Sequence, residues 1–187
     1  MKQLSIDGVW LHEPHAYSDN RGVFHEWFRS SSFESETGFD LPITQANCTF
    51  SRQGTLRGIH FSAAPGQAKY VTCVRGAVLD VAVDLRAGSP AFGSWEGVRL
   101  DDENRRALYL APDVGHGFMA LTEGAVVVYL CSNEYSDNLS RSVHPLDPDL
   151  AIDWPLEAVL SERDASAPSL AQARAQGLLP LARPRSG

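Results

Sequence analysis

Two short stretches of the sequence place a histidine and a lysine within ten residues of each other. His60 lies in the segment Leu56–Phe61, and Lys69 precedes the apolar residues that begin at Tyr70. Imidazole titrates near neutral pH, so His60 is a candidate general base. A fixed lysine can stabilise negative charge that develops on a substrate oxygen, which makes Lys69 a candidate partner. Both residues also have structural interpretations, as a core or surface histidine and as a solvated lysine at a strand edge.

The spacing of Arg57 and His60 decides whether the two can share a site. Side chains alternate between the two faces of a strand, and these residues are three positions apart. A regular strand therefore puts them on opposite faces. We expect both to line one cavity only if a bulge or bend at Gly58 shifts the alternation.

Three more residues could contribute to chemistry from distant parts of the chain. Tyr129 lies within the apolar segment Ala125–Cys131, where a buried phenol needs a hydrogen-bond partner or a cavity. His116 follows a turn, and Asp164 precedes a predicted C-terminal helix. The structural alternatives are a core tyrosine, a turn histidine and a helix N-cap. Periodicity does not choose between these interpretations.

Polar residues two positions apart form two further groups. Gln45 and Asn47 share one face of a predicted strand, and their amides could donate to a phosphate or a sugar. A solvent-facing strand explains them equally well. Phe24 and Glu26 share a face after a turn, in a segment that is typical of a hairpin with an exposed polar face.

Short β-rich segments separated by Gly, Pro, Asn and Asp must position these residues. The pattern predicts a mainly β fold, a barrel or sandwich with few peripheral helices. The clearest element is a predicted hairpin over Tyr70–Leu85 that turns at Arg75 and Gly76. The other predicted elements are strands at Trp95–Leu100, Ala107–Leu110, Gly117–Leu121 and Ala125–Cys131, and short helices from Ser31 or Ser32 to Gly38 and from about Pro168 to Gly177.

Length and composition limit the classes of protein to consider. The 187 residues, 43% of them hydrophobic, predict one domain over 1–187 with a frayed tail from about 181. A net charge of −7 argues against partners such as nucleic acid or anionic membranes. The N-terminal residues lack the pattern of a secretory signal, so we expect a cytoplasmic protein. The three cysteines, Cys48, Cys73 and Cys131, are interpreted as reduced core residues.

In their order along the chain, these motifs resemble the dTDP-4-dehydrorhamnose 3,5-epimerase family. The resemblance covers about residues 1–180, and seven ordered motifs carry more weight than any one of them. The motifs are Arg21-Gly22 with Phe24 and Glu26, Gln45-x-Asn47, Leu56–His60, Gln67-Ala68-Lys69, Gly115–Phe118, Tyr129, and Leu160-Ser161-x-x-Asp164.

The resemblance implies a cupin-type jelly-roll barrel and a homodimer that exchanges N-terminal strand segments. It makes His60 the general base and Asp164 the carboxylate that orients it. It makes Tyr129 the acid on the opposite face of the sugar and Lys69 the cation beside the enolate oxygen. The positions implied to hold the pyrophosphate and neighbouring groups are Arg57, Arg21, Gln45 and Asn47. Those implied to line the rest of the pocket are Phe24, Glu26, His116 and Tyr135.

The implied reaction is epimerisation of a dTDP-linked 4-keto-6-deoxy sugar at carbon 3, carbon 5 or both. A carbon beside a ketone loses a proton when the enolate is stabilised, and inversion needs an acceptor on one face and a donor on the other. This chemistry requires no metal or redox cofactor. The His-x-His pair that is typical of metal-binding cupins is also missing, because Phe61 and Ser62 follow His60.

Two positions depart from the pattern of the family. Many members have Pro and Glu two and five residues after the equivalent of Tyr135, whereas this chain has Asp137 and Ser140. The segment 143–150 looks more like members from antibiotic deoxysugar pathways, some of which invert a single carbon. A sugar-nucleotide 3,4-ketoisomerase and a non-enzymatic nucleotide-sugar-binding cupin are the alternative functions.

Overall fold

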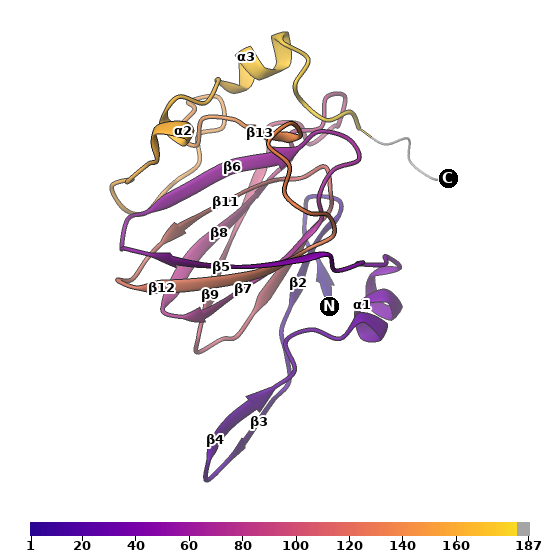
Figure 1. Ribbon diagram of the computed structural model, residues 1–187, viewed down its shortest axis with the longest axis vertical. Helices are drawn as coiled ribbons and strands as arrows, with labels where there is room; N and C mark the ends of the chain where they lie inside the picture. Colours follow the sequence, from indigo (N-terminus) through magenta and orange to yellow (C-terminus); the bar gives the residue numbers. More distant parts are fainter. Residues whose placement is uncertain (183–187) are drawn as a thin grey trace.

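The computed structural model, which describes residues 1–182, is built around two antiparallel β-sheets (Figure 1). The first sheet has the order β1 (Lys2–Gln3), β2 (Val9–His12), β10 (Ala107–Leu110), β7 (Lys69–Arg75), β12 (Ala125–Cys131), β5 (Gln45–Ser51). The second has the order β13 (Ser140–Ser142), β6 (Leu56–Ser62), β11 (Gly115–Ala120), β8 (Ala77–Val83), β9 (Trp95–Asp101). The mainly β fold predicted from the sequence is confirmed.

A separate hairpin of β3 (Ala16–Asp19) and β4 (Gly22–His25) projects from the body of the molecule (Figure 1). Its strands pair with each other and belong to neither sheet. The hairpin predicted around Arg21 is therefore confirmed, but it stands away from the barrel.

The helices are short and peripheral, as predicted (Figure 1). They are α1 (Ser30–Thr37), α2 (Glu162–Ala165) and α3 (Leu170–Ala175). Helix α1 ends at Gly38, whose φ of 73° is the left-handed conformation that glycine adopts readily. Helix α3 begins after Ser169, which forms a capping box with Gln172, so it is shorter than the predicted helix. Within residues 1–182 no helix is long and apolar enough to cross a membrane.

Two hydrophobic clusters hold the sheets in place. One includes Val71 and Val127 of the first sheet and Phe118 of the second, between the two sheets. The other covers the far face of the second sheet, where Ile59 packs with C-terminal residues such as Leu170. The C-terminal segment therefore closes the face behind β6. Its paired structure extends to residue 182 through a bridge to Ala87, whereas 183–187 lie outside the described residues.

The predicted hairpin over Tyr70–Leu85 is wrong. Strands β7 and β8 follow each other in sequence, yet β7 pairs with β10 and β12 while β8 pairs with β11 and β9. Gly76, with a φ of 72°, turns the chain from one sheet to the other. A glycine turn between two apolar segments fits a corner of a sandwich as well as a hairpin, because it does not specify which strands then pair.

Strand β5 reverses the usual polarity of a half-buried strand. Gln45 and Asn47 are partly buried and face inward, while Ala46, Cys48 and Phe50 are exposed on the outer face. The interpretation of all three cysteines as core residues is therefore wrong for Cys48, although Cys73 and Cys131 are buried. Polar residues inside a barrel and apolar residues outside it indicate an internal site and an outer surface suited to contact with protein.

Candidate active site

His60 and Asp164 form a partly buried pair between β6 and α2. His60 Nε2 lies 2.7 Å from Asp164 Oδ1. Helix α2 forms here because the Ser161 side chain caps it, accepting a hydrogen bond from the Asp164 N–H at 3.1 Å. Ser161 thus supplies the cap, and the Asp164 side chain remains free to hold the imidazole. The predicted dyad is present geometrically.

A bulge at Gly58, the condition for Arg57 and His60 to share a cavity, is present in β6. His116 pairs with His60 and Phe118 pairs with Arg57, so two residues of β6 lie opposite Gly117 alone. A Cβ on Gly58 would lie 2.5 Å from the Gly117 Cα, which explains why glycine occupies the bulge. The bulge brings Arg57 and His60 to the lining of the same hollow.

The surroundings of the dyad favour a neutral imidazole. Burial lowers the pKa of His60, and the hydrogen bond and charge of Asp164 only partly oppose that decrease. Burial alone would raise the pKa of Asp164, but the hydrogen bonds from His60 and Ser161 hold it below its ordinary value. With Asp164 ionised and accepting from Nε2–H, the neutral ring keeps its lone pair on Nδ1.

Lys69 and Tyr129 come from the other sheet. In this sheet β12 lies between β7 and β5. Cys131 of β12 is opposite Lys69 on β7 and Gln45 on β5. Tyr129 of β12 is opposite Val71 on β7 and Asn47 on β5. Alternation along these strands therefore turns Lys69, Tyr129 and the two amides toward one side. His60 stands on the opposing sheet, so the candidate base and the candidate acid occupy different walls.

Burial shifts the pKa of both groups on this wall. It lowers the pKa of Lys69, while Cys131 and Asp80 oppose the decrease. It raises the pKa of Tyr129, so the phenol is protonated at neutral pH. Tyr129 can therefore donate a proton, and a charged Lys69 acts in a site where water screens it poorly.

Two adjoining hollows, of about 230 Å³ and 200 Å³, contain these groups. Both are lined by His60, Lys69, Tyr129 and Arg163, so they form one continuous site. Gln45, Asn47 and Tyr135 line the first hollow; Arg57, His116 and Asp164 line the second. The structure thus brings nine predicted residues together, with a surplus of basic side chains suited to an anionic ligand.

His116 belongs to a second histidine–aspartate pair. Its Nε2 lies 3.0 Å from both carboxylate oxygens of Asp80, and both side chains are almost fully buried. His116 also lines the second hollow beside His60. The sequence singled out His116 but gave no reason to pair it with Asp80, which lies on the neighbouring strand β8.

Arg163 is the residue of the site that sequence reasoning missed. Its guanidinium donates to Tyr135 Oη at 3.0 Å and to Ser140 Oγ at 2.6 Å. Tyr135 Oη in turn donates to Asp137 at 2.7 Å. Asp137 and Ser140, the two residues that depart from the pattern of the family, therefore both belong to this hydrogen-bond network. The available signal was the position of Arg163 directly before Asp164.

Three predicted site residues do not join the hollows. Arg21, Phe24 and Glu26 lie on or beside the projecting hairpin, and Arg21 and Phe24 are 86% and 68% exposed. Within one chain they pair locally, Arg21 with Asp19 and Glu26 with Arg29. One chain alone thus assembles only part of the predicted site.

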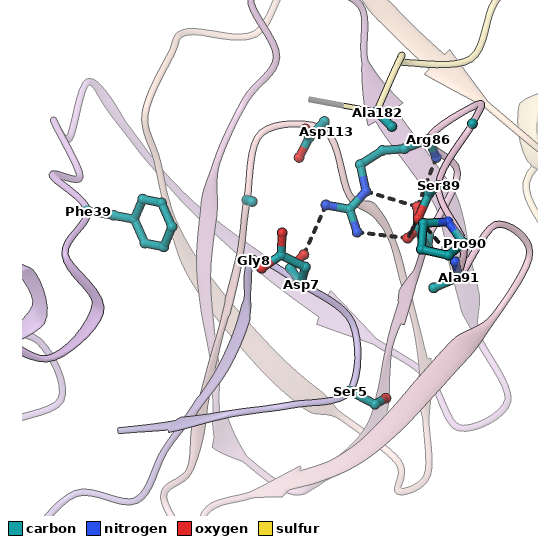
Figure 2. A pocket seen from close by; sticks show the side chains of 13 residues that line it. Ser5, Asp7, Gly8, Phe39, Arg86, Ser89, Pro90, Ala91, Asp113 and Ala182 are labelled. Carbon is teal, nitrogen blue, oxygen red and sulfur yellow. Dashed lines mark hydrogen bonds and ion pairs between the residues drawn. The ribbon is translucent and has the colours of Figure 1, made fainter. Parts of the chain in front are cut away.

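A larger hollow of about 710 Å³ lies elsewhere, beside Arg86 (Figure 2). Arg86 donates twice to Asp84, at 2.8 and 2.9 Å, and once to the Asp7 carbonyl at 3.1 Å. The Arg86 guanidinium therefore links the loop after β8 to the N-terminal segment through these hydrogen bonds. Among residues 1–182, no group of three or more His, Cys, Asp and Glu side chains is placed to hold a metal ion.

Comparison with known proteins identifies the family. The sequence model of the dTDP-4-dehydrorhamnose 3,5-epimerase family matches residues 3–172. The chain belongs to this family. A dTDP-4-dehydrorhamnose 3,5-epimerase from Streptomyces griseus is 52% identical over 96% of this chain and 91% of its own.

Solved structures of related epimerases have the same fold. A 4-keto-6-deoxy sugar epimerase from the novobiocin biosynthetic gene cluster of Streptomyces spheroides is 53% identical, with a TM-score of 0.94 over 96% of this chain and 92% of its own. A 3′-monoepimerase from Streptomyces bikiniensis, solved with dTDP-quinovose, is 53% identical, with a TM-score of 0.94 over 97% of this chain and 93% of its own. The jelly-roll fold implied by the resemblance is therefore confirmed.

Proposed function

We propose that the protein is a cytoplasmic, homodimeric isomerase that epimerises a dTDP-linked 4-keto-6-deoxyhexose at carbon 3, carbon 5 or both. The observation that carries this proposal is the arrangement of one hollow, with His60 and Asp164 on one wall and Lys69 and Tyr129 on the other. Inversion beside a ketone needs this division between a proton acceptor and a proton donor on opposite faces.

In the first step of the reaction, His60 would act as the base. A neutral imidazole is ready to accept a proton, and the decreased pKa of His60 keeps it neutral at neutral pH. The Nδ1 lone pair would take the proton from the carbon beside the ketone. Asp164, bonded at Nε2, would fix the orientation of the ring and stabilise the imidazolium that forms.

The second step needs a stabilised enolate and a donor on the far face. The Lys69 ammonium would bind the oxygen at carbon 4, where negative charge develops as the proton leaves. Burial of Lys69 increases the strength of this interaction because the local dielectric is low. Tyr129, protonated and on the opposite wall, would then deliver a proton to the other face of the carbon.

The nucleotide end of the substrate needs cations and hydrogen-bond donors. Arg57, Gln45 and Asn47 border the hollow and, with Arg21, would hold the pyrophosphate and its neighbours. The remaining proposed pocket residues are Tyr135, His116, Phe24 and Glu26. Binding of dTDP-quinovose by the Streptomyces bikiniensis relative supports a dTDP sugar as the ligand of this shared fold.

A homodimer that exchanges N-terminal strands would complete this site. Arg21, Phe24 and Glu26 stand outside the hollows of their own chain, on or beside a hairpin that projects into solvent. Strand β5 is an edge strand with an apolar outer face, where Phe50 is 63% exposed. An edge strand with an apolar face is suited to pairing with a strand of a second copy. The free thiols of Cys48, Cys73 and Cys131 fit a reducing, cytoplasmic setting.

The test is incubation with dTDP-4-keto-6-deoxyglucose in heavy water, with deuterium located by NMR. We expect deuterium and inverted stereochemistry at carbon 3, carbon 5 or both, and none with a His60→Ala control. Activity should persist with excess chelator, since no proposed step uses a metal or cofactor. Movement of the keto group to carbon 3 would instead identify a ketoisomerase. Binding without exchange would identify a non-enzymatic sugar-binding protein.

A further inference from the structure

The hairpin β3–β4 leaves the barrel after His12 and returns at Trp27. Between these points its side chains are mostly exposed, including Tyr17 at 61%. Arg21 and Glu26 form ion pairs with residues two or three positions away, which do not reach the barrel. The position of the hairpin relative to the barrel therefore depends on its two ends, which we call the root.

Tyr70 of β7 contacts both parts of this root, one on each side of the hairpin. Its hydroxyl donates to the Trp27 carbonyl at 2.8 Å and also contacts His12 Nδ1. The Phe28 ring packs against the Tyr70 ring edge to face, with centroids 5.1 Å apart, and Trp27 packs at 6.0 Å. Tyr70 is 1% exposed, so these bonds are protected from water.

Tyr70 directly follows Lys69 in the same strand. Successive side chains of a strand point to opposite faces of the sheet. Lys69 therefore faces the hollow, while Tyr70 lies on the other face of the sheet, where the hairpin root covers it. At Lys69 and Tyr70, strand β7 is held between β10 and β12. A single peptide link thus joins the candidate enolate-binding cation to the clamp on the hairpin.

We propose that Tyr70 is a positioning residue that fixes the hairpin of its own chain for use by the active site of the partner subunit. The inference rests on the proposed function, because it takes the hairpin residues Arg21, Phe24 and Glu26 as ligands of the nucleotide sugar in the dimer. Tyr70 touches no substrate and acts through the hairpin. Its effect is therefore on substrate binding in the other subunit.

The first test is Tyr70→Phe, which keeps the ring and removes only the hydroxyl. We expect KM for the nucleotide sugar to rise about tenfold with kcat little changed, since binding common to ground and transition states is lost. Amide hydrogen exchange of residues 16–25 should become faster, because the root is loosened. The matched control is Tyr109→Phe, whose ring lies beside Tyr70 in register but packs on Phe33 and Phe39. It should change neither measurement.

The second test uses mixed dimers, isolated with two different affinity tags. In a dimer of a His60→Ala chain and a Tyr70→Phe chain, the one active site receives the intact hairpin, so KM should equal that of wild type. In a dimer of a wild-type chain and a His60→Ala, Tyr70→Phe chain, the one active site receives the loosened hairpin, so KM should rise. The reverse pattern would show that Tyr70 acts within its own chain and would overturn the inference.

The two proposals fail in different ways. Absence of turnover by the wild-type protein would overturn the proposed function, while hydrogen exchange would still report on the clamp. Normal turnover with unchanged KM and unchanged exchange in Tyr70→Phe would overturn the clamp alone. If Tyr70→Phe does not fold, His12→Ala loosens the same root from its other end and should give the same changes.

Discussion

His60 and His116 are register partners on neighbouring strands, and each binds an aspartate through Nε2, yet the two pairs are built differently. His60 is 35% exposed and has one short contact to a carboxylate from a separate helix. His116 is 8% exposed and lies equally close to both oxygens of Asp80 on the next strand. The first pair is open to the hollow, whereas the second is almost fully buried in the sheet, with only the histidine bordering the hollow.

A histidine–aspartate pair is therefore not by itself a catalytic unit. Access to the hollow and a free ring nitrogen make His60 the candidate base, while Asp80 and His116 lie behind the site. Asp80 also raises the pKa of Lys69 against the effect of burial. In the proposed mechanism the buried pair therefore influences the cation that binds the enolate, and the open pair moves the proton.

Replacement of His60 should have the largest effect on activity. His60→Ala removes the proposed proton acceptor, so solvent exchange at carbons 3 and 5 should fall by about 10²–10⁴-fold. The fold should remain, because the His60 side chain is partly exposed and the Asp164 carboxylate keeps its hydrogen bonds with Ser161 and the Gly58 backbone. Deuterium incorporation and a thermal unfolding curve measure the two effects. Exchange at the normal rate would exclude His60 as the base.

Replacement of His116 should reduce the stability of the fold more than replacement of His60 does. His116→Ala leaves the fully buried Asp80 carboxylate without its partner, which should cost about 3–5 kcal/mol in the free energy of unfolding. Denaturant unfolding of this variant beside His60→Ala measures the difference. An equal loss of stability in both variants would show that the two pairs are not distinct in the way their burial indicates.

Tyr129→Phe tests whether the acid lies on the far wall or beside the base. If Tyr129 is the donor, the enolate still forms at His60, and the imidazolium returns a deuteron to the original face. Deuterium should then enter recovered substrate while inverted product becomes scarce. The fold should be retained, since only a hydroxyl is removed. An unchanged ratio of exchange to inversion would remove Tyr129 from the mechanism and return it to a structural role.

The sequence predicted the composition of this site better than its assembly. Gln45 and Asn47 were grouped because regular alternation puts them on one face of a strand. The roles of Tyr129 and Lys69 were predicted from the resemblance of the ordered motifs, because periodicity did not distinguish them from structural residues. The joint use of Arg57 and His60 depended on a bulge, which the sequence allowed at Gly58 but did not require. The predicted hairpin at Tyr70–Leu85 failed because strand pairing is set by contacts distant in sequence. The bonds of Arg163 to Tyr135 and Ser140 could not be predicted for the same reason.

The pH dependence of activity allows the roles of Asp164 and Asp80 to be compared directly. The proposed base must be neutral, so activity should be lost as pH falls through the pKa of His60, which burial holds below its ordinary value. The proposed enolate partner must be charged, so activity should be lost as pH rises through the pKa of Lys69, which burial also holds below its ordinary value. Asp164 raises the first pKa and Asp80 raises the second. Each aspartate therefore controls a different limb of the pH profile.

Asp164→Asn should move the acid limb to lower pH and reduce kcat about tenfold or more, because the ring loses both its counter-charge and its fixed orientation. Asp80→Asn should instead move the basic limb to lower pH, because Lys69 loses a negative charge that favours its protonated form. The acid limb of Asp80→Asn should stay where it is in the wild type. Profiles of kcat/KM against pH for the three proteins measure both limbs. Displacement of the same limb by both substitutions would mean that the two pairs act as one coupled network, and the contrast between an open pair that moves the proton and a sealed pair that adjusts the cation would be lost.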